Sequence, residues 1–256
     1  MEMLAMDRRN LILERIQKDT SVRVGDLAKE YNVTEETIRR DLEKLEKDGL
    51  VTRTYGGAVL TQTSGTYDFS FRVRETQNVE GKRRIALKVA EMIEDGDTLM
   101  VDSSTTAMFA VRELKNRSSI TMITNSVRIP QEVAFQENMN IIVTGGTLRP
   151  GIMSLVGNVT EDALKHYYVN VAILGCKAMD LAEGTFEPHE QEAVLKRKMC
   201  ENARQVIVVA DHTKFGKRSF VRTLSLADID VLVTDEQLPE QVERTLANAG
   251  VKLVYA

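Results

Sequence analysis

The stretch that most constrains the fold is a well-marked helix followed at once by a hairpin pattern, within residues 33–60. Thr34 is placed to cap the free backbone N–H groups of a helix, and two glutamates follow it at the positive end of the helix dipole. Apolar side chains then recur at i, i+4 and i+7 and predict one buried stripe, formed by Ile38, Leu42 and Leu45. The opposite face is charged and is free to contact a partner.

A hairpin is predicted directly after this helix. We expect Gly49 to end the helix, residues 50–55 to be extended, and Gly56-Gly57 to form a tight turn before residues 58–60. Upstream, apolar periodicity predicts two further helices, at residues 9–18 and 24–31, with a turn after the second. Short helices joined by about four residues and followed by a hairpin are typical of a winged helix-turn-helix.

The candidate DNA contacts lie on the third helix and on the hairpin. Residues 1–60 contain 11 Lys and Arg against 12 Asp and Glu, and the whole chain carries a net charge of −4, so any basic surface must be local. We expect the following residues to face DNA: Thr34, Glu36, Thr37, Arg39, Arg40, Lys44, Arg53 and Tyr55. A three-helix unit with a hairpin can also be a protein-docking module, and the pattern alone leaves that alternative open.

A larger second domain is predicted after a linker. The chain of 256 residues is long enough for two domains, and the Thr-, Ser-, Gln- and Gly-rich residues 61–80 predict a linker between domains at 1–60 and 81–256. Helices are predicted at 82–93, 105–114, 129–136, 159–167, 190–202 and 238–249, and strands at 98–101, 120–123, 141–143, 169–174, 206–210, 231–233 and 251–254. This alternation predicts an α/β fold with a parallel sheet covered on both faces.

Polar clusters follow four of the predicted strands, at the sheet edge where α/β proteins bind ligands. Hydroxyls and N–H groups at a helix start, together with Lys214, suit a phosphate, whereas Asp102 suits a sugar hydroxyl. The candidate effector-binding residues are Asp102, Ser103, Ser104, Thr105, Thr106, Thr124, Asn125, Gly145, Gly146, Glu192 and Lys214. Each cluster alone can be only a helix cap or a turn, but four clusters at successive strand ends favour a binding site.

Several kinds of site and location are not predicted. The three histidines lack metal-ligand spacing, and the sequence contains no Walker loop, nucleophile elbow or dinucleotide motif, so we expect neither a metal nor a cofactor. Two cysteines suit a reducing compartment. There is no long apolar run and no leader pattern at the start of the sequence, so we expect a cytoplasmic protein without a membrane segment.

The N-terminal motifs also carry a resemblance to a known family. They are Leu27-Ala28, Val33-Thr34, Thr37-Ile38-Arg39-Arg40-Asp41-Leu42, Leu45-Glu46, Gly49-Leu50 and Arg53-Thr54-Tyr55-Gly56-Gly57-Ala58. Together they resemble the DNA-binding signature of the DeoR family of bacterial regulators of sugar metabolism, and the resemblance covers nearly the whole chain. One departure lies where the family usually shows a Gly-Ala-Asp-Gly-like turn, because this chain has Gly175-Cys176-Lys177-Ala178-Met179-Asp180.

The resemblance implies a fold and a function. The larger domain would be a sensor with a fold similar to ribose phosphate isomerase, containing the polar clusters described above. The protein would be a transcription factor, usually a repressor, whose affinity for double-stranded operator DNA changes when a phosphorylated sugar or sugar derivative binds. A homo-dimer or homo-tetramer would match symmetric half-sites in the DNA.

An enzyme is the alternative from another class, namely a sugar-phosphate isomerase with an accessory N-terminal domain. It would need a general base and a group that stabilises an enediolate, for which Glu192 and Lys177 are candidates. The acid-rich turn that such isomerases use is missing here. We therefore expect a sensor without catalytic residues.

Overall fold

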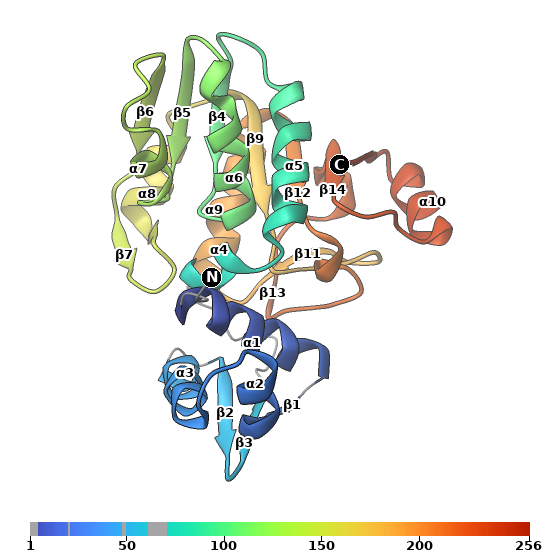
Figure 1. The fold of residues 1–256 in the computed structure, drawn as a ribbon. Coiled ribbons are helices and arrows are strands. Elements are labelled where there is room, and N and C mark those ends of the chain that lie inside the picture. Colours follow the sequence, from blue (N-terminus) through green and yellow to red (C-terminus); the bar gives the residue numbers. More distant parts are fainter. Residues whose placement is uncertain (1–4, 20, 48–49, 61–70) are drawn as a thin grey trace. The chain divides into compact units, whose positions relative to one another are not determined.

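The computed structural model describes residues 5–19, 21–47, 50–60 and 71–256 (Figure 1). The chain divides into two compact units, of which the first comprises residues 1–64 and 72–77 and the second residues 65–71 and 78–256. Much of the predicted linker lies outside the described residues. Its described part differs from the prediction, because it contains a short helix, α4 (Phe71–Thr76), and the start of α5 (Val79–Met92).

Between residues 5 and 60, the described part of the first unit contains three helices and a three-stranded antiparallel sheet, and most of α4 also belongs to this unit. The helices are α1 (Ala5–Asp19), α2 (Val24–Glu30) and α3 (Glu35–Lys47), and the strands, paired in the order β1-β3-β2, are β1 (Ser21–Arg23), β2 (Val51–Thr54) and β3 (Gly57–Leu60). This arrangement confirms the predicted winged helix-turn-helix. The predicted helix end at Gly49 lies outside the described residues. Strand β1 was not predicted, because three residues are too few to show alternation.

The turn of the wing differs from the prediction by one residue. Thr54 pairs with Gly57, so Tyr55 and Gly56 form the two-residue turn and Gly57 belongs to β3. A Cβ atom at Gly57 would lie 1.8 Å from the carbonyl oxygen of Val22 in β1. Glycine is therefore needed here for the close approach of β1 to β3.

The core of the first unit contains the predicted stripe of α3. Its buried apolar residues include Ile12, Ile16, Leu27, Ile38, Leu42, Leu45 and Leu50. One buried ion pair joins α1 to α3, since the Arg8 Nε atom lies 2.6 Å from Asp41 Oδ2. This pair fixes the third helix against the first with a directional contact that apolar packing alone does not supply.

The second unit is built on a seven-stranded parallel sheet, which confirms the predicted α/β fold. Its strands, in spatial order, are β15 (Lys252–Tyr255), β14 (Val231–Thr234), β12 (Ala203–Val209), β9 (Val169–Gly175), β4 (Thr98–Val101), β5 (Ile120–Thr124) and β6 (Met139–Val143). Central strands read as continuous apolar runs because both faces of the sheet are covered.

Helices cover the two faces of this sheet (Figure 1). One apolar core cluster includes residues of α5, α6 (Thr105–Glu113) and α7 (Ile129–Val133), and the other includes residues of α8 (Asn158–Leu164), α9 (Glu190–Glu201) and α10 (Glu240–Asn248). Along the chain, the sheet grows from β4 through β5 to β6, and then from β9 in the opposite direction. The strand order therefore reverses between β4 and β9, and parallel α/β sheets bind ligands at such a switch point.

Five short strands in this unit were not predicted. They form a hairpin of β7 (Thr147–Arg149) and β8 (Ser154–Val156), and a small antiparallel sheet of β10 (Ala178–Asp180), β11 (Gly184–Glu187) and β13 (Val221–Arg222). Short 3-10 helices occur at Leu114–Asn116, His212–Lys214 and Leu226–Asp228. Segments of two or three residues are too short for periodicity to identify them, and the four residues of β11 include a single large apolar side chain, Phe186.

No helix among the described residues is both long enough and apolar enough to cross a membrane.

Candidate functional site

The third helix begins as its sequence predicts. The Thr37 backbone N–H donates to the Thr34 hydroxyl at 3.2 Å, and the two hydroxyls lie 2.9 Å apart. Ile38 and Leu42 are buried, whereas Arg39 and Arg40 on the opposite face are exposed. The cap and the apolar stripe thus leave the predicted DNA-contacting face open to solvent.

Each arginine on this face is paired with a glutamate one turn earlier. Arg39 lies 2.7 Å from Glu35, and Arg40 lies 3.2 Å from Glu36. Exposed i,i+4 pairs of this kind contribute only about 0.3–0.5 kcal/mol, so a phosphate or a base edge can displace the carboxylate at small cost. The pairs hold the guanidinium groups extended along the helix while the face is free.

The wing is joined to the third helix through Glu46. Its carboxylate accepts from the Arg53 backbone N–H at 3.0 Å and from the Arg53 Nε at 2.7 Å. These two hydrogen bonds also lower the pKa of Glu46 below its ordinary value. Tyr55, at the turn of the wing, is fully exposed. The two wing residues expected to contact DNA therefore lie on the surface of the first unit.

In the second unit, Asp102 occupies the end of β4 at the switch point of the sheet. Its Oδ1 accepts from the Ser104 N–H at 2.9 Å, and its Oδ2 accepts from the Gly175 N–H at 2.8 Å. A Cβ atom at Gly175 would lie 2.4 Å from Ser104 Oγ, so a glycine is required where the two loops meet. Asp102 thus joins the end of β4 to the end of β9.

A buried lysine completes this cluster. Lys196 of α9 lies 2.7 Å from Asp102 Oδ2 and 2.5 Å from Glu187 Oε1, and it donates to the Gly175 carbonyl at 2.6 Å. Burial alone would lower the pKa of Lys196, but the two carboxylates outweigh burial and raise it well above its ordinary value. The ammonium therefore stays charged, and it crosslinks β4, β9 and β11 through α9.

Glu192 lies one turn before Lys196 on the same helix and forms a second buried cluster. Its Oε1 accepts from Arg149 NH1 at 2.8 Å and from the Ser154 hydroxyl, both contributed by the β7–β8 hairpin. The side chain of Glu192 is 5 % exposed. Glu192 is therefore buried and paired, and it is not the solvated helix start that its sequence position also allows; a role in binding an effector stays a prediction.

The loop after β5 contacts the same hairpin. The Asn125 amide donates to the Leu155 carbonyl at 3.2 Å, while its Oδ1 atom is buried without a hydrogen-bond partner in the structure. The Thr124 hydroxyl donates to the Val101 carbonyl at 2.6 Å and accepts from the Ser126 N–H at 3.1 Å. Thr124 thus closes the turn, whereas Asn125 retains an acceptor that a ligand can satisfy.

One of the serines and threonines after β4 caps a helix, and the other three are buried beside it. The Ser104 hydroxyl accepts from the Ala107 N–H at 3.2 Å and caps α6. Ser103, Thr105 and Thr106 are buried beside it at the positive end of the helix. The anion cradle stays a prediction, and the Ser104 hydroxyl is used by the helix itself.

Gly145 and Gly146 follow β6, two strands away from β4. Both adopt positive φ angles, of 72° and 119°, and the Thr160 hydroxyl donates to the Gly145 carbonyl at 2.7 Å. A Cβ atom at Gly146 would lie 2.1 Å from Thr160 Oγ1. These contacts give the glycines a role in packing against α8, and no described contact joins them to the Asp102 cluster.

Lys214 lies in the 3-10 helix after β12, the strand that pairs with β9 on the side away from β4. Its ammonium is 3.8 Å from Asp211 Oδ2, and its side chain is 25 % exposed. Burial raises the pKa of the neighbouring Cys176 thiol to about 12, with Glu187 contributing in the same direction and Lys196 and Lys214 opposing it. Cys176 therefore stays protonated beside the cluster.

Sequence reasoning missed the residues that complete both clusters, namely Lys196, Glu187, Arg149 and Ser154. One signal was present, because Lys196 follows Glu192 by four residues and lies between the apolar Leu195 and Met199 on a helix. A charged residue on a buried face indicates a paired partner. The partners themselves lie on short strands that were not predicted.

An open cavity of about 490 Å³ lies at the opposite, amino end of the sheet. It is lined by residues that flank the starts of β5 and β6, namely Ser118, Ser119, Ile120, Thr121, Glu137, Asn138, Met139 and Asn140. None of the predicted effector-binding residues contributes to it.

Comparisons with known proteins match both units. Residues 8–64 match the model of the DeoR-like helix-turn-helix domain, and residues 77–236 match that of the DeoR C terminal sensor domain. The HTH-type transcriptional regulator YulB of Bacillus subtilis is 38% identical over 98% of this chain and 96% of its own length. The glycerol-3-phosphate regulon repressor of Escherichia coli K12 is 32% identical over 96% of this chain and 97% of its own length.

Among solved structures, ribose 5-phosphate isomerase A of Methanocaldococcus jannaschii is similar to part of the chain. The similarity has a TM-score of 0.41 and 17% identity, and it covers 54% of this chain and 55% of that one.

A winged helix-turn-helix unit followed by a sensor domain defines the chain as a DNA-binding transcriptional regulator. It belongs to the DeoR family. The relatives given above are named as regulators, and the isomerase alternative is not favoured.

Proposed function

We propose that the protein represses an operon for the catabolism of a sugar or a sugar derivative, and that a phosphorylated metabolite controls its affinity for operator DNA. The observation that carries the proposal is the buried cluster of Asp102, Lys196 and Glu187 at the switch point of the sheet. It ties three strand ends and one helix together, so a ligand bound there touches several elements at once. The name of the glycerol-3-phosphate regulon repressor also supports a phosphorylated effector.

The first turn of α6 is the proposed phosphate cradle. Its N–H groups and the hydroxyls of Ser103, Thr105 and Thr106 lie at the positive helix end, and Lys214 adds a cation from the β12 loop. An ionised carboxylate offers about four acceptor positions, and Asp102 uses three of them on Ser104, Gly175 and Lys196. About one position remains for a hydroxyl of the sugar.

The proposed DNA contacts of the third helix and the wing are of two kinds, to bases and to phosphates. Glu36, Thr37 and Arg40 are assigned to base edges in the major groove, whereas Arg39, Lys44 and Arg53 are assigned to phosphates. Thr34 caps the helix at its groove end, and Tyr55 extends from the wing. A homo-dimer or homo-tetramer would present two such helices to symmetric half-sites.

The DNA assignment is tested with Arg40→Ala. The matched control is Arg204→Ala, because Arg204 is also exposed but lies on β12 of the other unit. Binding to the DNA upstream of the protein's own gene is measured by fluorescence anisotropy at fixed salt. We expect Arg40→Ala to weaken specific binding by about 1–3 kcal/mol, roughly 5- to 150-fold, and the control to bind as the wild type does. Unchanged binding by Arg40→Ala would contradict the assignment.

The effector assignment is tested with Lys214→Met. A panel of sugar phosphates is screened by thermal shift on the full chain, and the matched control is Lys165→Met, on the exposed surface after α8. A compound that raises the melting temperature of the wild type and of the control should act more weakly on Lys214→Met. Equal shifts in all three proteins would place the ligand elsewhere.

A further inference from the structure

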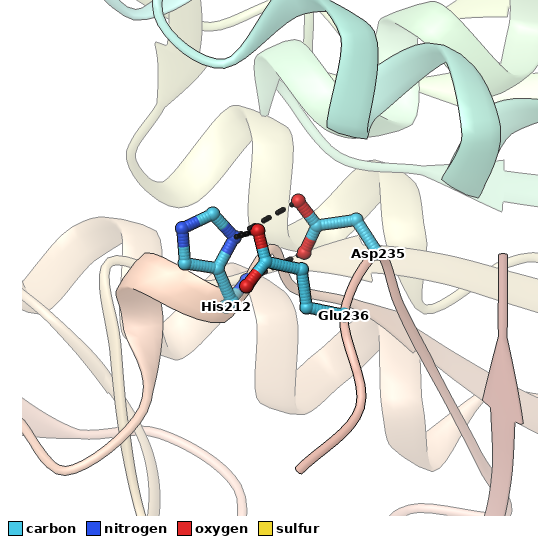
Figure 2. A group of neighbouring side chains, drawn as sticks. All are labelled: His212, Asp235 and Glu236. Atoms are coloured by element: carbon cyan, nitrogen blue, oxygen red, sulfur yellow. Dashed lines mark hydrogen bonds and ion pairs between the residues drawn. The ribbon is translucent and has the colours of Figure 1, made fainter.

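One histidine and two carboxylates meet at the carboxyl edge of the sheet, on the loops after β12 and β14 (Figure 2). The His212 Nδ1 atom lies 3.0 Å from Asp235 Oδ2 and 3.2 Å from Glu236 Oε1. Within the part of the chain that the structure describes, this is the one group of three such residues whose ligand atoms all lie within 4.8 Å of one another. Strands β12 and β14 are paired in parallel, which brings the two loops together.

We propose that His212, Asp235 and Glu236 bind one divalent transition-metal ion of the zinc type. Zinc bonds to imidazole nitrogen and carboxylate oxygen are about 2.0–2.2 Å long, so tetrahedral geometry separates two donor atoms by about 3.3 Å. The two separations at Nδ1, 3.0 and 3.2 Å, are close to that value. One ring nitrogen carries at most one hydrogen, so it cannot form a full hydrogen bond to both carboxylates.

The mixture of donors selects the class of ion. An imidazole nitrogen with two carboxylate oxygens suits zinc and its neighbours among the transition metals, whereas magnesium and calcium prefer oxygen alone. A metal-bound imidazole is neutral, so the charges of two carboxylate ligands would together match that of a divalent cation. The nearby Arg84 guanidinium donates at 2.8 Å to the backbone carbonyl of Asp235 and not to its carboxylate.

Asp235 is held in place by groups behind it. Its Oδ2 accepts from the Asn78 amide at 2.8 Å, and its Oδ1 accepts from the His212 backbone N–H at 2.7 Å. A Cβ atom at Gly81 would lie 2.2 Å from Oδ2, so α5 leaves space for this carboxylate only because that residue is a glycine. Outer hydrogen bonds of this kind orient the ligands of metal sites.

The front of the group is open to solvent. The side chain of Asp235 is 1 % exposed, whereas those of His212 and Glu236 are 38 % and 57 % exposed. Three protein donors with one open side leave room for water as the fourth ligand. A bound ion would tie the loop that carries Lys214 to the end of β14, and this consequence does not depend on which effector the sensor takes.

The test is a titration of the full chain with zinc chloride. The protein is first treated with a chelator and dialysed, and binding is followed by isothermal titration calorimetry. The variants are His212→Gln and Glu236→Gln, and the matched control is His166→Gln, because His166 is exposed and lies outside the group. We expect one zinc ion per chain at this site, with affinity at least about ten-fold weaker in both variants and unchanged in the control.

Three outcomes would overturn the proposal. They are a wild-type chain that binds no zinc, a His212→Gln protein that binds zinc as the wild type does, and equal affinity for magnesium and zinc. Circular dichroism verifies that each variant is folded. Because Glu236 is exposed, its substitution tests the site without disturbing the core. Cobalt gives a second readout, since its visible absorption should change in Glu236→Gln and remain in His166→Gln.

Discussion

Replacing Lys196 with methionine removes the cation that two buried carboxylates share. Its ammonium lies 2.7 Å from Asp102 and 2.5 Å from Glu187, whose side chains are 2 % and 10 % exposed. Removing one partner of a buried ion pair costs about 3–5 kcal/mol, because the other charge stays buried without compensation. We therefore expect Lys196→Met to lower the free energy of unfolding of the sensor unit by about 3–5 kcal/mol.

The loss should also depend on pH in a defined direction. Burial raises the pKa of Glu187 above its ordinary value in the wild type, and removing the Lys196 charge raises it further. A carboxyl group whose folded-state pKa exceeds its unfolded-state pKa binds more protons when folded, so stability falls as the pH rises between the two values. The difference between wild type and Lys196→Met should therefore be larger at pH 8 than at pH 5.

The assay is urea unfolding of the full chain at both pH values, followed by circular dichroism. The two units can unfold separately, so the midpoint of each transition is compared. Lys165→Met is the control, because it removes an exposed lysine that pairs with Asp162 on the surface, and its midpoints should match those of the wild type. If Lys196→Met lowers the free energy of unfolding by less than about 1 kcal/mol, as a surface pair would, the reasoning is refuted. It is also refuted if the difference between wild type and Lys196→Met is larger at pH 5 than at pH 8.

Three further predictions concern single residues. Asp41→Ala removes the partner of the buried Arg8 guanidinium, whose Nε atom lies 2.6 Å from Asp41 Oδ2. The free energy of unfolding of the first unit, measured in urea, should fall by about 3 kcal/mol, and an unchanged midpoint would contradict the role of this pair. Gly57→Ala places a Cβ 1.8 Å from the Val22 carbonyl oxygen, so β1 should separate from β3. The affinity for DNA, measured by fluorescence anisotropy, should then fall about ten-fold, and wild-type affinity would contradict this. Burial raises the pKa of the Cys176 thiol to about 12, so iodoacetamide at pH 8 should modify this thiol far more slowly than it modifies free cysteine. Mass spectrometry measures the rate of modification, and equal rates would contradict the burial.

The long elements of the fold could be predicted from the sequence because their apolar patterns repeat. The strand at residues 98–101 was placed with its observed bounds, and the stripe of Ile38, Leu42 and Leu45 is buried as predicted. Helix ends were displaced by a few residues, as with α5, which begins at Val79. Most of the missed strands have two or three residues, and alternation needs at least four residues to be visible.

The candidate site was predicted only in part, because sequence order shows which residues follow a strand but not which side chains meet. Asp102 and Glu192 were identified, but their partners Lys196 and Arg149 were not. His212 was set aside for lack of metal-ligand spacing, yet it meets Asp235, 23 residues later, because two parallel strands end side by side. Contacts between distant loops depend on strand order, which reverses between β4 and β9 without a local signal.

The most direct test of a metabolite-controlled DNA-binding protein is a reciprocal titration. The affinity of the full chain for its operator is measured with and without a saturating sugar phosphate, and the affinity for that sugar phosphate is measured with and without operator DNA, at the same salt. Thermodynamic linkage requires both affinities to change by the same factor, which we expect to be about 5- to 150-fold. A sugar phosphate that binds the sensor unit while operator affinity stays unchanged would contradict control of DNA binding by the metabolite.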